Sequence, residues 1–385
     1  MKNFCIVLSV LAIILFSPCC VVRGEAFASE EKILKFSFGS KSWEFSKEEL
    51  IDNVSKEKQK LLDGYTLSDG MEKLTSLGFD SKTAVLYYFD NIDVVLEQIA
   101  GEVDLSAVDS EIVFDTSLPY ATKEREGRRV LKEKMYQDIY SAIVEESGEV
   151  VVESEPLLPD IVHDQNALFI NKRGAFTTYI NGVNQQGRIH NIKTALSRFD
   201  KKRIESGEVV SFNEVIGDTT EKNGYAKAKV ILNGKYVDDF GGGVCQAATT
   251  LYNALLLSDI EIREANPHSL KVGYVAGSFD AMVSCGVSDL VFVNNTDGPI
   301  FISTYCTDYE CGATIFGAEN IYQIKRRSES VEFDKEKYPN ISSKSVGFLE
   351  YYVDGQKVRD EKIRSDSYFV PKLENVEEQK LGEVQ

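Results

Sequence analysis

The sequence predicts an α+β protein in which one principal helix packs on a mostly antiparallel sheet, preceded by a smaller α+β domain. The chain has 385 residues, more than one typical domain, and 43% of them are hydrophobic, which is ample for packed cores. Many short strand-like stretches follow residue 205, two of them joined by Asn233-Gly234, a strong hairpin signal. Among them, "VCQAATTLYNALLL" starts at Val244 and has its apolar residues at helical spacing.

The start of the chain predicts export. Lys2 precedes the apolar run "FCIVLSVLAIILF", and Ala26–Ala28 has the small-x-small pattern of a signal-peptidase site. We therefore expect residues 1–28 to be a signal peptide. The alternative is an uncleaved N-terminal membrane anchor, because the apolar stretch extends to Val22 and would then just span a bilayer. In both cases we expect the remainder of the chain outside the cytoplasm.

Charge and histidine content exclude some partners. The net charge of −18 argues against a nucleic-acid partner, because a phosphate backbone would repel such a surface. The three histidines, His163, His190 and His268, are too scattered to form a zinc site by spacing. We therefore expect neither a metal nor an organic cofactor.

Four cysteines lie beyond the leader: Cys245, Cys285, Cys306 and Cys311. In an exported chain, four cysteines can form two disulfides. Cys306 and Cys311, in "CTDYEC", are close enough to bridge each other across a turn, and the spacing leaves this open.

The range 30–165 mixes short strands with amphipathic helices and is predicted to be one domain. Three stretches have apolar residues at helical spacing: "EELIDNVSKEKQKLL", "KTAVLYYFDNIDVVLEQIAGEV" and "GRRVLKEKMYQDIYSAIVEE". The acidic stretch "EESGEVVVESEPLLPD" then alternates like an edge strand and continues as a linker. This predicts a domain boundary near 160–168.

The range 168–325 is predicted to be the second domain, and 326–385 a β-hairpin extension with a polar tail. "HNIKTALSRF" predicts a helix. Strands are expected at "LKVGYV", "AMVSC", "DLVFVNN", "IFISTYC" and "TIFGA". The tail contains a second hairpin signal, Asp354-Gly355, in "FLEYYVDGQKVRDEKI".

Cys245 is the first candidate for chemistry. It follows three glycines in "GGGVCQ", which permit a sharp turn from a strand into the helix. The first turn of a helix favours a thiolate, because its free N–H groups and the helix dipole are positive there. The same N–H groups suit an oxyanion. The alternative is a buried structural thiol.

A cysteine nucleophile needs a base and an orienting group. His268, in "NPHSLKVGY", is expected at the entrance of a strand after the helix, and Asp280, in "FDAMVSC", at the start of the next strand. Cysteine, histidine and a polar residue in this order form the papain-like arrangement. The alternatives are a structural histidine and an aspartate that caps a turn.

Six further residues are candidates for substrate binding. Arg188, in "GRIHNIKTAL", is suited to pairing with a carboxylate. His190 is either a second base or part of a recognition cluster with Asn191, and the alternative for this group is a helix-start hydrogen-bond cluster. The candidates beside Cys245 and His268 are Gly243, Gln246 and Ser269.

Several of these segments together resemble the VanW family. They are "GRIHNIKTALSRFD", "SGEVVSFNEVIG", "GYAKAKVILNGK", "GGGVCQAATTLYNALLL", "NPHSLKVGYV", "FDAMVS" and "DLVFVNNTDGPIFI". The resemblance covers about residues 168–320, and the upstream stretch around "EIVFDTSLPYATKEREGRRV" resembles the peptidoglycan-binding domain often found before VanW. Two departures are Ala247-Ala248, where a Val-Ser-like pair is expected, and "VAGSFDA", which lacks a proline-rich turn.

The resemblance implies work on the cell wall, with peptidoglycan stem peptides and glycan as partners. Some members are understood to be cysteine-dependent L,D-transpeptidases, which implies that Cys245 is the nucleophile. His268 matches the family's histidine position, and the triad argument makes it the base and Asp280 the orienting residue. The expected product is a cross-link between two third-position stem residues, with release of D-Ala.

Two other functions remain open at this point. A peptidoglycan hydrolase would use the same residues, with water in place of the acceptor amine. A non-catalytic wall-binding protein would have Cys245 buried or paired with Cys285.

Overall fold

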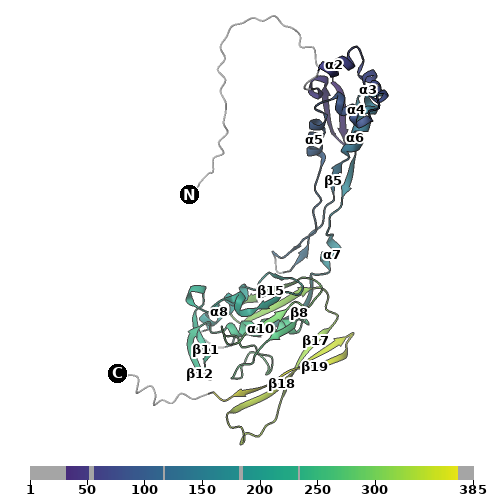
Figure 1. Cartoon of the computed structure of the whole chain (residues 1–385). Helices are drawn as coiled ribbons and strands as arrows, with labels where there is room; N and C mark the ends of the chain where they lie inside the picture. The colour runs from purple at the N-terminus through teal and green to yellow at the C-terminus, as the bar shows by residue number, and fades with distance from the viewer. Residues whose placement is uncertain (1–31, 52–55, 116–117, 182–184, 233–234, 372–385) are drawn as a thin grey trace, which may run out of the picture. The chain divides into compact units, whose positions relative to one another are not determined.

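The chain divides into two compact units, which are described separately (Figure 1). The computed structural model describes residues 32–51, 56–115, 118–181, 185–232 and 235–371. The N-terminal unit takes the described residues up to Leu105 together with Arg128–Pro156, and the C-terminal unit takes Ser106–Gly127 and the residues from Leu157 onward. Residues 106–127 therefore cluster with the second unit, although they lie inside the range that the sequence predicts as the first domain.

Three predictions lie outside the described residues: the signal peptide or anchor at 1–28, the turn at Asn233-Gly234 and the polar tail beyond residue 371. Among the described residues, no helix combines the length and the apolarity needed to cross a membrane.

The N-terminal unit is a small three-stranded sheet with helices. Strand β1 (Lys32–Phe38) lies between β2 (Lys41–Ser46), which is antiparallel to it, and β6 (Glu149–Val151), which is parallel. The other elements are α1 (Lys47–Leu50), α2 (Lys56–Leu62), α3 (Leu67–Ser76), α4 (Ser81–Tyr88), α5 (Ile92–Val103), β5 (Gly127–Val130), α6 (Lys132–Val144) and β7 (Ser154–Leu157). The stretch that begins at Lys82 forms two helices: α4 ends at Tyr88, with Phe89 as its C-cap, and α5 begins at Ile92.

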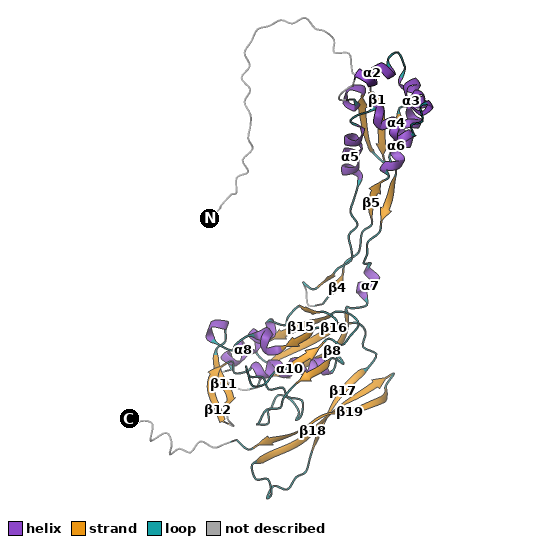
Figure 2. Ribbon diagram, in the orientation of Figure 1, coloured by secondary structure: helices purple, strands orange, loops and turns teal. Residues whose placement is uncertain are grey.

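The C-terminal unit is built on a four-stranded antiparallel sheet in the order β8-β16-β15-β9. These strands are β8 (Asn171–Tyr179), β9 (Lys202–Ile204), β15 (Ile300–Cys306) and β16 (Glu310–Gly317). Helix α10 (Val244–Leu256) packs on β8 and β16, and helix α8 (Gln186–Ser197) packs on α10 and β15 (Figure 2). The predicted α+β class with mostly antiparallel sheets is confirmed.

Smaller sheets surround this layer. The order β10-β14-β13 joins β10 (Val209–Ser211), β13 (Glu261–Glu264) and β14 (Val291–Val293), and β11 (Lys227–Leu232) pairs with β12 (Lys235–Phe240). The short elements are β3 (Ile112–Val113), β4 (Tyr120–Ala121), α7 (His163–Ala167), α9 (Phe212–Ile216) and the 3-10 turn η1 (Glu221–Asn223).

The C-terminal hairpin is long. Strands β17 (Gln323–Ser330), β18 (Ile341–Val353) and β19 (Gln356–Phe369) form one antiparallel sheet in chain order. Asp354 and Gly355 both have positive φ, 49° and 78°, as a two-residue hairpin turn of the primed type requires. The predicted Asp-Gly hairpin is therefore confirmed.

The segment 265–290 differs from its prediction. Strands were expected at 270–275 and 281–285, but the segment is irregular, with only isolated bridges such as Asn266 with Met282. Side chains replace the ladder: Thr249 of α10 accepts from the Ala281 N–H at 2.9 Å, and Asn253 donates to the Phe279 carbonyl at 2.8 Å. Residues 279–281 are thus held on the helix that carries Cys245.

The four described cysteines are free thiols. Cys306 and Cys311 face each other across β15 and β16. The Thr307 N–H donates to the Glu310 carbonyl at 2.8 Å, and alternation along an antiparallel ladder then makes Cys306 and Cys311 a non-hydrogen-bonded pair, the closer kind.

Replacing Leu251 with alanine tests the central packing of α10. Leu251 is fully buried in the core of the C-terminal unit. We expect Leu251→Ala to lower the free energy of unfolding by about 2–5 kcal/mol, because a cavity adds to the lost transfer energy. Urea unfolding followed by circular dichroism measures this. The control Val287→Ala, at a side chain that is 78% exposed, should change stability by less than about 0.5 kcal/mol; equal effects would contradict the assignment of the core.

Candidate active site

The three positions before α10 have no room for a side chain, so each must be glycine. A Cβ at Gly242 would lie 2.7 Å from the Ala228 carbonyl carbon, and one at Gly243 would lie 2.9 Å from the Arg188 Cγ. Gly241 and Gly243 also have φ of 84° and 110°, which disfavour other residues. The chain can therefore leave β12 and enter α10 within three residues only because no side chain is present.

Asn191 fixes this turn by hydrogen bonds to the backbone on both sides of it. Its amide donates to the carbonyls of Ala226, at 2.8 Å, and Gly242, at 3.0 Å, and its oxygen accepts the Ala226 N–H at 2.7 Å. The side chain is fully buried. Asn191 thus positions the start of α10, and its amide is occupied by backbone rather than open to a substrate.

Cys245 lies in the first turn of α10, partly exposed. Its thiol donates to the Val283 carbonyl at 3.3 Å, and the neighbouring His268 side chain lowers the pKa of this thiol. Among the hydrogen bonds of the described residues, none involves the Cys245 N–H, so this donor is available at the helix start.

His268 and Asp280 form a buried pair beside the cysteine. The His268 Nδ1 lies 2.8 Å from the Asp280 Oδ2, and the same oxygen accepts the His268 backbone N–H at 2.7 Å. His268 is 5% exposed and Asp280 1%. Because Nδ1 is engaged by the carboxylate, Nε2 is the ring nitrogen left for Cys245. Cys245, His268 and Asp280 therefore lie in the order of a relay, with the His268–Asp280 half joined by two hydrogen bonds.

The electrostatics of this relay favour an ion pair. Burial opposes ionisation of Cys245, but the hydrogen bond and the positive charge of His268 outweigh it and lower the pKa of the thiol. Burial also opposes the charge on His268, but its hydrogen bonds with Asp280 and Cys245 raise its pKa to about 9. For Asp280, burial is outweighed by the hydrogen bonds from His268 and by nearby positive charges, so its pKa is lowered.

Arg188 and Gln246 lie next to the cysteine. The Arg188 Nη2 donates to the Gln246 Oε1 at 2.7 Å, and the Gln246 Nε2 donates to the Thr178 Oγ1 at 3.1 Å and the Tyr179 carbonyl at 3.0 Å. The buried Gln246 side chain thus holds the Arg188 guanidinium in place. The charge of Arg188 is one of the causes that lower the pKa of Cys245.

Two candidates lie outside this cluster. His190 is exposed on α8, and its Nε2 lies 2.7 Å from the Gly224 carbonyl. Ser269 is also exposed, and its carbonyl accepts the Phe369 N–H at 2.7 Å. In the structure both residues bind neighbouring backbone rather than the relay.

Three residues of the site were not identified from the sequence. The Arg188 guanidinium lies 5.8 Å from the ring centroid of Tyr274, whose pKa is raised by burial and then by the nearby Cys245 charge. Arg364 and Tyr368, on β19, contact the Asp280 carboxylate. Tyr274 lies within the "HSLKVGYV" motif, but Arg364 and Tyr368 are 84 and 88 residues from Asp280, and no local pattern marks them.

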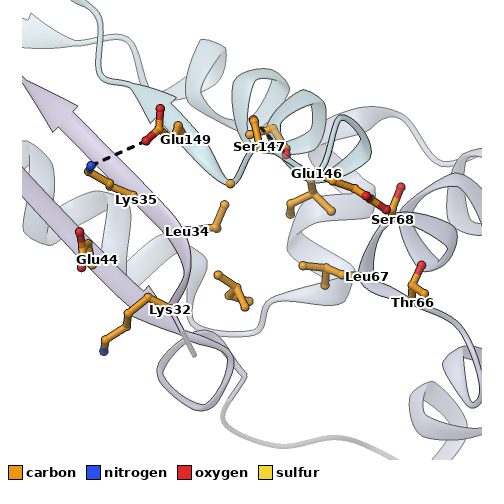
Figure 3. A pocket seen from close by; sticks show the side chains of 14 residues that line it. Lys32, Leu34, Lys35, Glu44, Thr66, Leu67, Ser68, Glu146, Ser147 and Glu149 are labelled. Atoms are coloured by element: carbon orange, nitrogen blue, oxygen red, sulfur yellow. Dashed lines mark hydrogen bonds and ion pairs between the residues drawn. The ribbon is translucent and has the colours of Figure 1, made fainter. Parts of the chain in front are cut away.

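The N-terminal unit has a separate groove of about 490 Å³. It is lined by side chains of β1, the start of α3 and the turn between α6 and β6 (Figure 3). The lining is mixed in charge: Lys35 pairs with Glu149 at 3.7 Å, and Thr66 and Ser68 line the opposite side of the groove. In the described part of the chain, no group of three or more His, Cys, Asp or Glu side chains is placed to hold a metal ion.

Comparison with known proteins identifies part of the C-terminal unit. Residues 187–316 match the family model described as VanW like protein. An uncharacterized protein from Bacillus subtilis (strain 168), YoaR, is 36% identical over 129 residues, covering 34% of this chain and 42% of that protein. The vancomycin B-type resistance protein VanW from Enterococcus faecalis (strain ATCC 700802 / V583) is 26% identical over 148 residues, covering 37% of this chain and 52% of that protein.

The chain thus spans about half, or less, of the length of these relatives. No solved structure matches it. The matched range contains Arg188, Cys245, His268 and Asp280, the residues that converge at the start of α10. Residues 187–316 of this chain are therefore a domain of the VanW family.

Proposed function

We propose that this protein is a cysteine-dependent L,D-transpeptidase that cross-links peptidoglycan stem peptides outside the cytoplasmic membrane. The observation that carries the proposal is the relay of Cys245, His268 and Asp280 at the start of a helix. VanW family membership suggests a cell-wall-related protein, and one relative is named a vancomycin resistance protein.

In the first step, the Cys245 thiolate attacks the carbonyl that joins the third stem residue to its terminal D-Ala. The developing oxyanion lies near the N-terminus of α10, where the Cys245 N–H is available to donate. The His268 imidazolium gives its proton to the D-Ala nitrogen as the C–N bond breaks. The products are a thioester on Cys245, free D-Ala and a neutral His268.

In the second step, the side-chain amine of another stem attacks the thioester. Neutral His268 takes the proton from this amine as the new amide bond forms, and the sulfur leaves as a thiolate. The ion pair of Cys245 and His268 is thereby restored. Throughout the cycle, Asp280 keeps its bonds to His268 and stabilises the imidazolium when it is present.

Arg188 is the residue that we assign to the terminal carboxylate of the donor peptide. It lies beside Cys245, half-buried, and its described polar contact is with the neutral Gln246. Among the described residues, no carboxylate lies within ion-pair distance of its guanidinium. A guanidinium held in this way suits a bidentate contact with a carboxylate.

The groove of the N-terminal unit is the place that we assign to wall binding. Its lining combines positive and negative side chains with the hydroxyls of Thr66 and Ser68. Such a surface suits a ligand that carries hydroxyl, amide and charged groups, as the glycan and its peptides do. In this proposal the N-terminal unit holds the wall while the C-terminal unit performs the transfer.

Incubating the purified protein with a disaccharide-tetrapeptide tests the reaction. We expect a cross-linked dimer and free D-Ala, and we expect Cys245→Ala to lower this rate by roughly 10³-fold or more because the nucleophile is lost. Mass spectrometry of the products gives the readout. The matched control is Cys285→Ala, an exposed thiol whose replacement should leave the rate unchanged.

Other products would identify other functions. Tripeptide without dimer would indicate a hydrolase that uses the same relay, since water would then resolve the thioester. No turnover, together with retained binding to purified wall, would indicate a wall-binding protein and would contradict the proposal.

The pH dependence of kcat/KM tests the ion pair. The pKa of His268 is raised to about 9, so its imidazolium is present below that pH and is lost above it. We therefore expect a bell-shaped profile whose alkaline limb lies near pH 9. Asp280→Asn removes the negative charge that stabilises the imidazolium and should move this limb down by roughly 1–3 pH units. An alkaline limb that stays in place in the folded variant would exclude His268 as the proton donor.

Replacing Arg188 tests carboxylate recognition. We expect Arg188→Gln to raise KM for the tetrapeptide by roughly 10- to 100-fold, because a hydrogen-bonded charge pair contributes about 1.5–3 kcal/mol. For a tetrapeptide with a C-terminal amide, KM should be the same for the wild type and for Arg188→Gln, because this substrate has no carboxylate for Arg188 to bind. Arg198→Gln, at an exposed position at the end of the same helix, is the matched control. If Arg188→Gln impaired the reaction of both substrates equally, Arg188 would act only by stabilising the Cys245 thiolate.

A further inference from the structure

We propose that Arg364 and Tyr368, on the C-terminal strand β19, are positioning residues that hold the Asp280 carboxylate in the orientation that aims His268 at Cys245. This inference rests on the proposed function, because it assigns a role within the same relay. It also makes the β18–β19 hairpin part of the site, although the hairpin lies beyond the matched range 187–316.

The two oxygens of Asp280 are divided between two parts of the chain. Oδ2 accepts both hydrogen bonds from His268, at 2.7 and 2.8 Å. Oδ1 accepts the Tyr368 hydroxyl at 2.7 Å and the Arg364 Nη2 at 3.0 Å. A carboxylate with two donors on each oxygen cannot rotate without losing some of them, so the β19 contacts determine which oxygen faces the histidine.

Tyr368 is itself fixed by a second contact. Its hydroxyl oxygen accepts the Ser278 N–H at 2.7 Å, which leaves its single proton for Asp280. The side chain is 1% exposed. Tyr368 therefore connects the backbone two residues before Asp280 with the carboxylate of Asp280, and it has no open path to a substrate.

Arg364 is fixed in the same way. Its Nε donates to the Asp366 Oδ2 at 2.8 Å, and its Nη2 donates to the backbone carbonyl of Asp280 as well as to the carboxylate. Its positive charge is also one of the causes that lower the pKa of Asp280. Arg364 therefore keeps a buried acid both ionised and oriented.

The hairpin also supports the irregular segment that carries His268 and Asp280. The Ser278 hydroxyl lies 2.8 Å from that of Ser345 on β18, and a Cβ at Gly277 would lie 2.4 Å from the Ser345 Oγ. At the other end, the Phe369 N–H donates to the carbonyl of Ser269, the neighbour of His268. The segment forms no strand at these residues, so its contacts with β18 and β19 fix its position.

The pH dependence of Cys245 alkylation by iodoacetamide tests this inference on the full chain without any substrate. Tyr368→Phe removes one donor and no charge, and Arg364→Lys keeps the charge but loses the forked geometry. We expect each variant to move the midpoint of thiolate formation to higher pH. At the wild-type midpoint, the alkylation rate should fall about 3-fold or more, because a less firmly held Asp280 stabilises the imidazolium less. Lys362→Gln, at an exposed position on β19, is the matched control and should leave the midpoint unchanged.

A double-variant comparison separates positioning from general loss of structure. In the Asp280→Asn background, Tyr368→Phe should change the alkylation rate by less than about 2-fold, because the negative charge that Tyr368 orients is already gone. Circular dichroism confirms that each variant is folded. Midpoints that match the wild type in folded Tyr368→Phe and Arg364→Lys, or equal effects with and without Asp280, would overturn the inference.

The outcomes also separate this inference from the proposed function. A wild-type Cys245 that titrates as an ordinary thiol would overturn both. A low wild-type midpoint that the two variants leave unchanged would overturn the positioning role alone. Midpoints that shift as expected in a protein that forms no cross-links would overturn the transpeptidase and leave the positioning role in place.

Discussion

The C-terminal unit depends on one buried charge, the carboxylate of Asp280. An ionised group that is 1% exposed is tolerated only when donors replace the water that it has lost. Here the donors come from His268 on one side and from Arg364 and Tyr368 on the other. Losing any of these donors would leave the buried charge less compensated. The contacts of Asp280 therefore hold the irregular segment 265–290 against the C-terminal hairpin, and the same contacts orient His268.

The other half of the site is the start of α10. Glycines let the backbone of β12 and α10 approach Ala228 and Arg188 too closely for any side chain, and Asn191 fixes the resulting turn. The thiol is thus presented at the positive end of a 13-residue helix. Burial opposes the thiolate, so the charge on His268 decides the balance, and that charge depends in turn on Asp280.

Local sequence patterns were enough to predict the elements formed by consecutive residues. Helix α10, the hairpin turn at Asp354-Gly355 and the α+β class follow from periodicity and turn chemistry. The ranges 270–275 and 281–285 were wrongly predicted as strands, because their apolar residues suit a strand, while backbone groups of this segment bond to side chains of α10 and β19. Alternating apolar residues indicate that one side of a segment is buried. They do not show which groups form hydrogen bonds with its backbone N–H and C=O groups.

The sequence by itself determined which groups this protein has available: a thiol after a glycine turn, one histidine downstream of it and an aspartate beyond that. Only the tertiary structure decided which of them meet. It brings Cys245, His268 and Asp280 together, leaves His190 on the surface and adds Arg364 and Tyr368 from more than 80 residues away. The physical reason is that a buried carboxylate selects its donors by distance and direction in three dimensions, and such contacts leave no periodic trace along the chain.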